Sequence, residues 1–173
     1  MSATESSRLY VVLLVDDDLR TTRRMADMLR EDGFAVEIAR DGAAAVARLS
    51  RSPTPDALVT ELTTAHADGV AIGRFARSQR PGLPVLFVTG YPNLFDPAVF
   101  SGEPPALLFT KPVDYAALRS ALRDALHSAS ASDVQGAFAT EDASASGALE
   151  STTDDARRNA LSGAQTLRAL RRP

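Results

Sequence analysis

Residues 9–18 read LYVVLLVDDD, so seven apolar residues are followed at once by three aspartates, Asp16, Asp17 and Asp18. A continuous run of valine and leucine is typical of a strand that is buried on both faces, as in a parallel sheet. Open α/β sheets bind their ligands outside the carboxyl ends of the strands. Because three carboxylates at such an end repel one another, this stretch predicts a site for a divalent cation or another positive partner.

The composition limits the classes of protein to which this chain can belong. Its 173 residues suffice for one domain and a tail, and a hydrophobic content of 45% suits a globular core. The net charge of -3 gives no indication of nucleic-acid binding, and the lack of cysteine excludes disulfides and thiolate metal sites. The first eight residues show no signal peptide and no apolar run could span a bilayer, so we expect a cytoplasmic protein.

Strand and helix patterns alternate along the chain after the three aspartates. Further strands are expected at residues 34–39, 56–62, 85–88 and 106–109, and helices at residues 19–32, 43–49, 69–80 and 115–127. This alternation predicts an α/β fold with a doubly wound parallel sheet and right-handed crossovers. Residues 91–105 contain Pro92, Pro97, Pro104 and Pro105, so a helix can begin there but a long one cannot cross the segment.

The chain divides by composition into four parts. We expect residues 1–8 to be a disordered N-terminus and residues 9–128 to form the domain. Residues 129–155 are dominated by Ser, Ala, Thr, Asp and Glu, which is typical of a disordered linker or tail. Residues 156–173 form a basic tail, and the spacing of its leucines is compatible with a short amphipathic helix.

The expected topology brings the ends of the first, third, fourth and fifth strands to one edge of the sheet. Asp16, Asp17, Glu61, Thr89 and Lys111 would gather there. Carboxylate and carbonyl oxygens suit Mg²⁺, and a lysine with a threonine hydroxyl can hold the other oxygens of a phosphoryl group. A carboxylate at a strand end can also act as the nucleophile that becomes an acyl phosphate. The set is therefore typical of a phosphoryl-transfer pocket.

With these residues, the chain from about residue 10 to residue 127 resembles the receiver domain of two-component response regulators. The matching motifs are Val15-Asp16-Asp17, Pro55-Asp56 leading to Glu61, Asp68-Gly69, Val88-Thr89-Gly90 and Lys111-Pro112. The resemblance implies a flavodoxin-like, five-stranded sheet in the order 2-1-3-4-5, flanked by five helices. It also implies Mg²⁺-dependent phosphoryl transfer from a histidine kinase or a phosphotransfer protein. The implied site has Asp16, Asp17, Glu61 and Thr63 on the metal side, and Thr89, Lys111 and Pro112 around the phosphoryl group.

Glu61 is the main departure from the family, because it stands where receivers carry the aspartate that accepts the phosphoryl group. Its additional methylene extends the carboxylate by about 1.5 Å, which displaces a nucleophilic oxygen from in-line geometry. We hypothesise that Glu61 resembles the phosphorylated state and that the domain signals without phosphorylation. Two arrangements stay open: Glu61 binds Mg²⁺ with Asp17 and the Thr63 carbonyl, or it pairs with Lys111 and closes the site.

A second departure concerns the residue three positions before the lysine. The family usually has Tyr or Phe there, whereas this chain has Leu108, with Phe109 next to it on the opposite face of the strand. This difference calls the usual aromatic switch into question. By resemblance, the partner face is expected on residues 91–105, the fifth strand and the last helix.

The leading interpretation is a non-enzymatic, atypical single-domain response regulator that acts by protein–protein interaction. Its expected partners are a histidine kinase, a phosphotransfer protein or a downstream effector. We expect no nucleic acid, because the C-terminal tail shows no helix-turn-helix pattern, and no membrane, because no apolar run is long enough to span one. The oligomeric state stays open, and a homodimer is compatible with the sequence.

Two alternative functions fit parts of the same pattern. One is a haloacid-dehalogenase-like phosphohydrolase, which would use Asp16-Asp17-Asp18, Thr89 and Lys111, although the cap and a second acidic pair are missing. The other is a scaffold receiver that has lost Mg²⁺ and phosphoryl chemistry and acts by partner docking.

Overall fold

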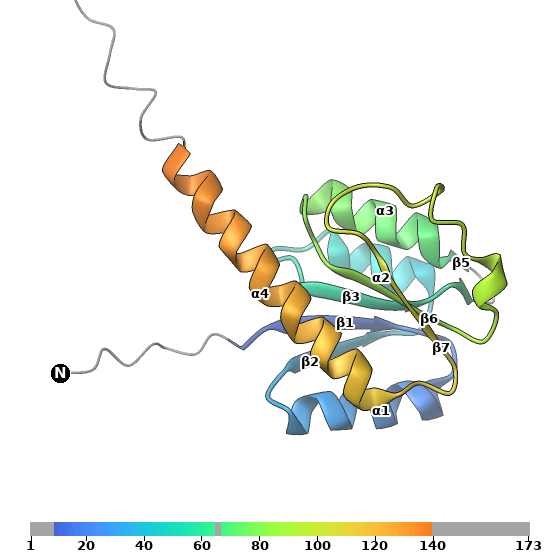
Figure 1. Ribbon diagram of the computed structural model, residues 1–173. Helices are drawn as coiled ribbons and strands as arrows, with labels where there is room; N and C mark the ends of the chain where they lie inside the picture. The colour runs from blue at the N-terminus through green and yellow to red at the C-terminus, as the bar shows by residue number, and fades with distance from the viewer. Residues whose placement is uncertain (1–8, 65–66, 140–173) are drawn as a thin grey trace, which may run out of the picture.

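The computed structural model describes residues 9–64 and 67–139. Its centre is a parallel sheet in the order β2-β1-β3-β6-β7, which confirms the predicted 2-1-3-4-5 order (Figure 1). The strands are β1 (Val11–Val15), β2 (Ala35–Ala39), β3 (Ala57–Glu61), β6 (Val85–Thr89) and β7 (Leu107–Thr110). The helices are α1 (Leu19–Glu31), α2 (Gly42–Leu49), α3 (Gly69–Gln79) and α4 (Tyr115–Ala139). A small antiparallel pair, β4 (Thr63–Thr64) and β5 (Ala67–Asp68), lies between β3 and α3.

Two apolar layers cover the sheet, with α1 and α4 on one face and α2 and α3 on the other (Figure 1). Successive residues of β1 enter opposite layers: Val12 and Leu14 pack with α1 and α4, whereas Leu13 and Val15 pack with α2 and α3. All four are at most 2% exposed. This explains why the first strand is a continuous apolar run and not an alternating one.

Aspartates set the starts of the helices. Asp18 accepts hydrogen bonds from the backbone N–H groups of Arg20 and Thr21, at 3.1 and 3.4 Å, and therefore caps α1. Asp114 caps α4 in the same way through the N–H of Ala117 at 3.2 Å. At the other end of α1, Gly33 takes the left-handed conformation, with φ of 88°, that ends the helix. The caps fix where each helix begins relative to the strand end before it.

The implied fifth helix is absent from the described residues. Between β6 and β7 they contain only the 3₁₀ turn η1 (Pro92–Leu94), so the expectation of five flanking helices is wrong for this part of the chain. The prolines of the segment lack the N–H that a longer helix requires. Phe95 and Phe100 cover the sheet instead, since their rings lie 5.1 and 5.2 Å from that of Phe87. Aromatic packing thus replaces a helix on this face.

The last helix is longer than predicted, because α4 continues to Ala139 and not only to His127. The first part of the predicted linker is therefore helical. Its many alanines are strong helix formers, and extending an existing helix costs far less than starting one. The predictions for residues 1–8, 140–155 and 156–173 lie outside the described residues. No helix of the described chain is both long enough and apolar enough to cross a membrane.

Candidate functional site

Three of the predicted site residues meet at the carboxyl edge of the sheet. Asp16 directly follows β1, Glu61 is the last residue of β3, and Lys111 directly follows β7. The strands are parallel and in register, with Glu61 opposite Val88 of β6. The same edge of the sheet therefore carries all three side chains, although Asp16 and Lys111 are 95 residues apart in sequence.

Lys111 joins the two carboxylates. Its Nζ lies 2.8 Å from Oδ2 of Asp16 and 2.6 Å from Oε2 of Glu61. The other oxygen of each acid accepts a backbone hydrogen bond, Asp16 Oδ1 from Asp18 N and Glu61 Oε1 from Leu62 N, both at 2.9 Å. Each of the four carboxylate oxygens thus accepts a hydrogen bond. We call Lys111, Asp16 and Glu61 together the lysine clamp.

The lysine clamp is largely shielded from water. The side chains of Glu61, Asp16 and Lys111 are 9%, 13% and 28% exposed. Burial by itself would lower the pKa of Lys111, but the hydrogen bonds and the charges of Asp16 and Glu61 outweigh it, so the pKa is raised above that of a free lysine. The ammonium group is therefore fully charged at neutral pH, and it neutralises part of the acidic site.

This arrangement is the second of the two that the sequence left open, in which Glu61 pairs with Lys111. In the described part of the chain, no group of three or more His, Asp or Glu side chains is placed to hold a metal ion. Asp17 is exposed beside the clamp, and Thr63 lies in β4, opposite Asp68 of β5. Although carboxylates suit Mg²⁺, an ammonium group between them repels a divalent cation, so the clamp as arranged does not fit the metal.

The other predicted residues lie close to the clamp without joining it. Thr89 is fully buried, its hydroxyl accepts a hydrogen bond from Tyr91 N at 3.1 Å, and its carbonyl accepts one from Lys111 N at 2.8 Å. Pro112 follows Lys111 through a cis peptide bond. Leu108 is 37% exposed and points away from the layer in which Phe109 packs.

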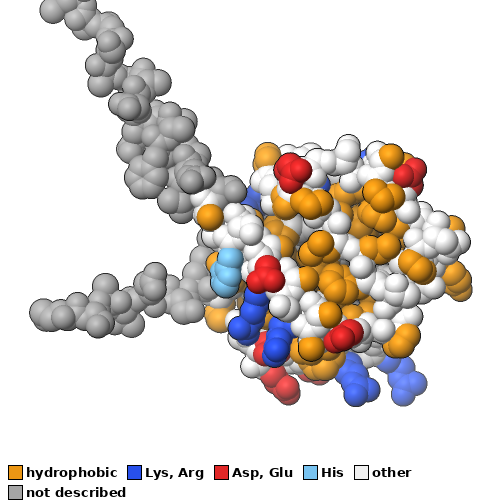
Figure 2. All heavy atoms as spheres, viewed as in Figure 1, with side chains coloured by type: hydrophobic (Ala, Val, Ile, Leu, Met, Phe, Trp, Pro, Cys, Tyr) orange, Lys and Arg blue, Asp and Glu red, His pale blue; other side chains and the backbone are white. Residues whose placement is uncertain are grey.

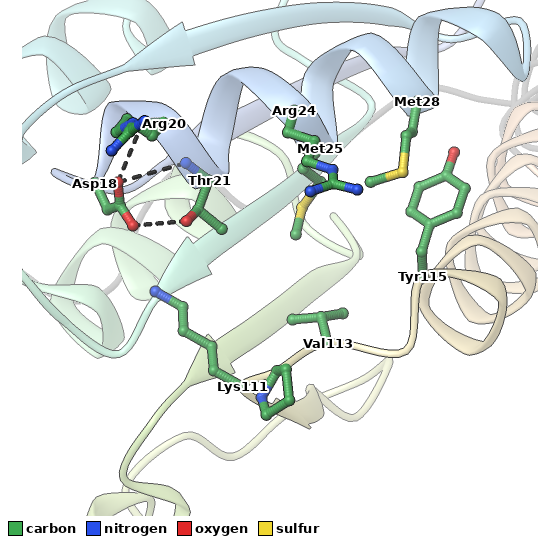
Figure 3. A pocket seen from close by; sticks show the side chains of 10 residues that line it. Asp18, Arg20, Thr21, Arg24, Met25, Met28, Lys111, Val113 and Tyr115 are labelled. Atoms are coloured by element: carbon green, nitrogen blue, oxygen red, sulfur yellow. Dashed lines mark hydrogen bonds between the residues drawn. The ribbon is translucent and has the colours of Figure 1, made fainter.

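Sequence reasoning missed a groove beside the clamp. It is open, measures about 1080 Å³, and lies between the first three turns of α1 and the loop from Lys111 to Tyr115 (Figure 3). Arg20, Arg24, Met25 and Met28 come from α1, and Tyr115 faces them from the start of α4. The spacing of the two arginines by four residues was the available signal, because such residues share one side of a helix.

The comparisons with known proteins agree with this fold. Residues 12–123 match the family model described as the response regulator receiver domain. The transcriptional regulatory protein GlrR of Escherichia coli (strain K12) is 32% identical over 123 residues, which are 70% of this chain but 28% of that protein. The response regulator MprA of Mycobacterium avium (strain 104) is 36% identical over 78 residues, or 45% of this chain and 34% of that one. The chain thus corresponds to about a third or less of these relatives' length.

Two solved structures are similar over most of the described chain. A response regulator receiver protein from Sinorhizobium medicae WSM419 has 25% sequence identity and a TM-score of 0.62, covering 70% of this chain and 98% of that one. A CheY-like receiver domain protein from Methanospirillum hungatei JF-1 has 25% identity and a TM-score of 0.65, covering 72% and 99%. The similarity therefore spans a whole receiver domain in both cases.

Proposed function

This chain belongs to the response regulator receiver domain family, and on that premise we propose that it signals by protein contacts without accepting a phosphoryl group at position 61. The observation that carries the proposal is the contact of 2.6 Å between Lys111 Nζ and Glu61 Oε2. A carboxylate that acts as nucleophile needs an oxygen that is free and correctly placed. Both oxygens of Glu61 accept hydrogen bonds, and the side chain is one methylene longer than aspartate.

The position of the charge supports constant signalling. The negative charge of Glu61 lies further from the strand than that of an aspartate would, and it already engages Lys111. A phosphoryl group on an aspartate would likewise place negative charge further out. We propose that this contact holds the domain in a state that resembles the phosphorylated one.

The proposal includes weak Mg²⁺ binding, since Mg²⁺ is the metal that receiver domains typically bind at their acidic pocket and here the clamp occupies it. Titrating the full chain with Mg²⁺ while recording backbone amide NMR spectra tests this part. We expect no saturable shift of Asp16, Asp17 or Glu61 up to 10-fold above an ordinary cellular concentration of about 1 mM. Saturation near 1 mM would contradict the closed site.

The partner face is proposed on the surface around β7. Tyr91, Leu94, Val99 and Leu108 are each more than a third exposed there. Figure 2 shows hydrophobic side chains gathered over the face on which β7 and the preceding segment lie. Exposed apolar side chains in this density favour a protein partner, either a histidine kinase, a phosphotransfer protein or an effector. A cytoplasmic location and action without enzymatic turnover belong to the same proposal.

Phosphorylation by acetyl phosphate provides the decisive experiment. Wild-type protein with Mg²⁺ and acetyl phosphate should show no phosphoryl adduct by intact mass, whereas Glu61→Asp should gain one. Glu61→Gln is the matched control, because it has the same length and cannot form an acyl phosphate. A stoichiometric adduct on the wild type that is lost in Glu61→Ala would contradict the proposal. Turnover of p-nitrophenyl phosphate by the wild type would instead support a phosphohydrolase.

A further inference from the structure

The groove beside the clamp carries two arginines without a partner among the described residues. Neither the guanidinium of Arg20 nor that of Arg24 forms an ion pair there, whereas Arg30 of the same helix pairs with Asp27 at 3.0 Å. Both arginines lie along the rim of the groove on consecutive turns of α1 (Figure 3). Two unpaired cations four residues apart form a site for acidic side chains.

The floor of the groove is apolar. Met25 and Met28 of α1 face Val113 and Tyr115 across it, and Met25, Val113 and Tyr115 also pack against the buried core. Methionine side chains adapt to irregular partners, and an aromatic ring adds contact area at low entropic cost. The groove therefore fits a peptide that combines carboxylates with an apolar side chain.

The chain itself contains such a peptide within reach. α4 begins at the groove with Tyr115 and carries the chain about 36 Å away over its 25 residues, since a helix rises about 1.5 Å per residue. Figure 1 shows this helix projecting beyond the domain. At no more than about 3.6 Å per extended residue, at least about 10 residues after Ala139 are needed to return to the groove. The first position that can reach it is thus near residue 149.

The residues at that distance have the required chemistry. Between Thr140 and Ala156 the sequence contains five acidic and no basic residues, and Leu149, Glu150, Asp154 and Asp155 lie where the chain first reaches the groove. The five arginines of residues 157–172 follow only afterwards and would be repelled by Arg20 and Arg24. Charge and length together favour the acidic segment over the basic one.

We propose that residues 149–155 of this chain dock in the groove, with their carboxylates on Arg20 and Arg24 and Leu149 against the methionines. A segment that occupies the groove competes with any acidic partner that uses the same groove. The inference rests on the groove, the length of the chain and the charge of the segment. It does not depend on whether Glu61 accepts a phosphoryl group, and the two proposals therefore fail separately.

Paramagnetic relaxation enhancement tests the docking in the full chain. Because the protein has no cysteine, Ser151→Cys introduces a single spin-label position. The label should reduce amide signals of residues 20–28 at least 2-fold while leaving those of α2 unchanged. Arg20→Glu combined with Arg24→Glu should abolish the effect, and adding Asp154→Arg and Asp155→Arg to that variant should restore it. Arg23→Glu is the matched control, since Arg23 is exposed on the same helix but does not line the groove.

Three results would overturn the proposal. The first is an unchanged signal from residues 20–28 in the labelled chain at low salt. The second is an equal loss of the effect in Arg23→Glu, which would reduce the contact to general attraction by α1. The third is broadening that appears when a spin-labelled, unenriched chain is mixed with an unlabelled ¹⁵N chain, because the occupant would then be a second copy. Amide spectra of every variant check that the fold is retained.

Discussion

Replacing Lys111 by methionine gives the sharpest test of the clamp. Methionine keeps most of the aliphatic stem and removes only the ammonium group, which lies 2.8 Å from Asp16 and 2.6 Å from Glu61. Two carboxylates that are 13% and 9% exposed would then face each other without a cation. We expect a large loss of stability, because neither acid can regain its hydration in place.

The size of the loss follows from the exposure of the three groups. Removing one partner of a fully buried pair costs about 3–5 kcal/mol, whereas an exposed pair contributes about 0–1 kcal/mol. The lysine is 28% exposed, so the clamp lies between these limits but nearer to the buried one. We expect Lys111→Met to lower the free energy of unfolding by about 2–3 kcal/mol. Adding Glu61→Gln should recover about half of this loss, because only one unpaired charge remains.

Urea denaturation followed by circular dichroism measures these values at pH 7. A loss below about 0.5 kcal/mol would refute the clamp as the dominant interaction of the site.

The wild-type protein makes a related prediction at alkaline pH. Lys111 is the only lysine in the sequence, so a single ¹⁵N-lysine signal reports its ammonium group directly. The pKa of Lys111 is raised in the folded state. The charged lysine therefore contributes its full stability below about pH 10.4, the pKa of a lysine in an unfolded chain. This contribution is lost as the pH rises through the pKa of the folded state. A midpoint at or below that of a free lysine would contradict the contacts with Asp16 and Glu61.

Two further predictions concern residues that surround the site. Gly69→Ala should destabilise the fold by about 2–3 kcal/mol, because a Cβ at this position would lie 2.1 Å from the carbonyl oxygen of Glu61. Gly90→Ala is the control in the same urea assay. A Cβ at position 90 meets nothing within 4 Å, so stability should change by less than about 0.5 kcal/mol. Tyr115→Phe removes the 2.6 Å hydrogen bond to Asp32 and should lower the stability at pH 7. That hydrogen bond is the main reason why the pKa of Asp32 is lowered, so the difference should diminish as the pH falls below about 4, and a constant difference would contradict the assignment.

The architecture could be predicted from the sequence because its signals are local. Continuous apolar runs at residues 11–15 and 85–88 indicate strands buried on both faces, and the order of strands and helices then restricts the topology. The errors arise where composition is ambiguous. The serine- and alanine-rich residues after His127 suit a linker as well as a helix, and only the continuity with α4 decides between them.

The site was predictable in its membership but not in its contacts. The parallel topology places Asp16, Glu61 and Lys111 at one edge, and this needs only the strand assignments. Whether Glu61 reaches Lys111 or turns towards Asp17 depends on the rotamer of its side chain. It also depends on the N–H of Leu62, which donates a hydrogen bond to the other carboxylate oxygen of Glu61. Such choices are made by packing and hydrogen bonding in three dimensions, which residue spacing does not encode.

A single methylene group at position 61 therefore decides which of two kinds of site this fold forms. Glu61 Oε2 now lies 2.6 Å from Lys111 Nζ, and a carboxylate shorter by about 1.5 Å on the same backbone would end beyond hydrogen-bonding distance of the ammonium group. Lys111 would then keep only Asp16, and the freed carboxylate would regain oxygens that can accept a cation or a phosphoryl group. Glu61→Asp should accordingly gain Mg²⁺ affinity together with phosphorylation. If the variant gained neither, the residues around position 61, and not the length of its side chain, would prevent Mg²⁺ binding and phosphorylation.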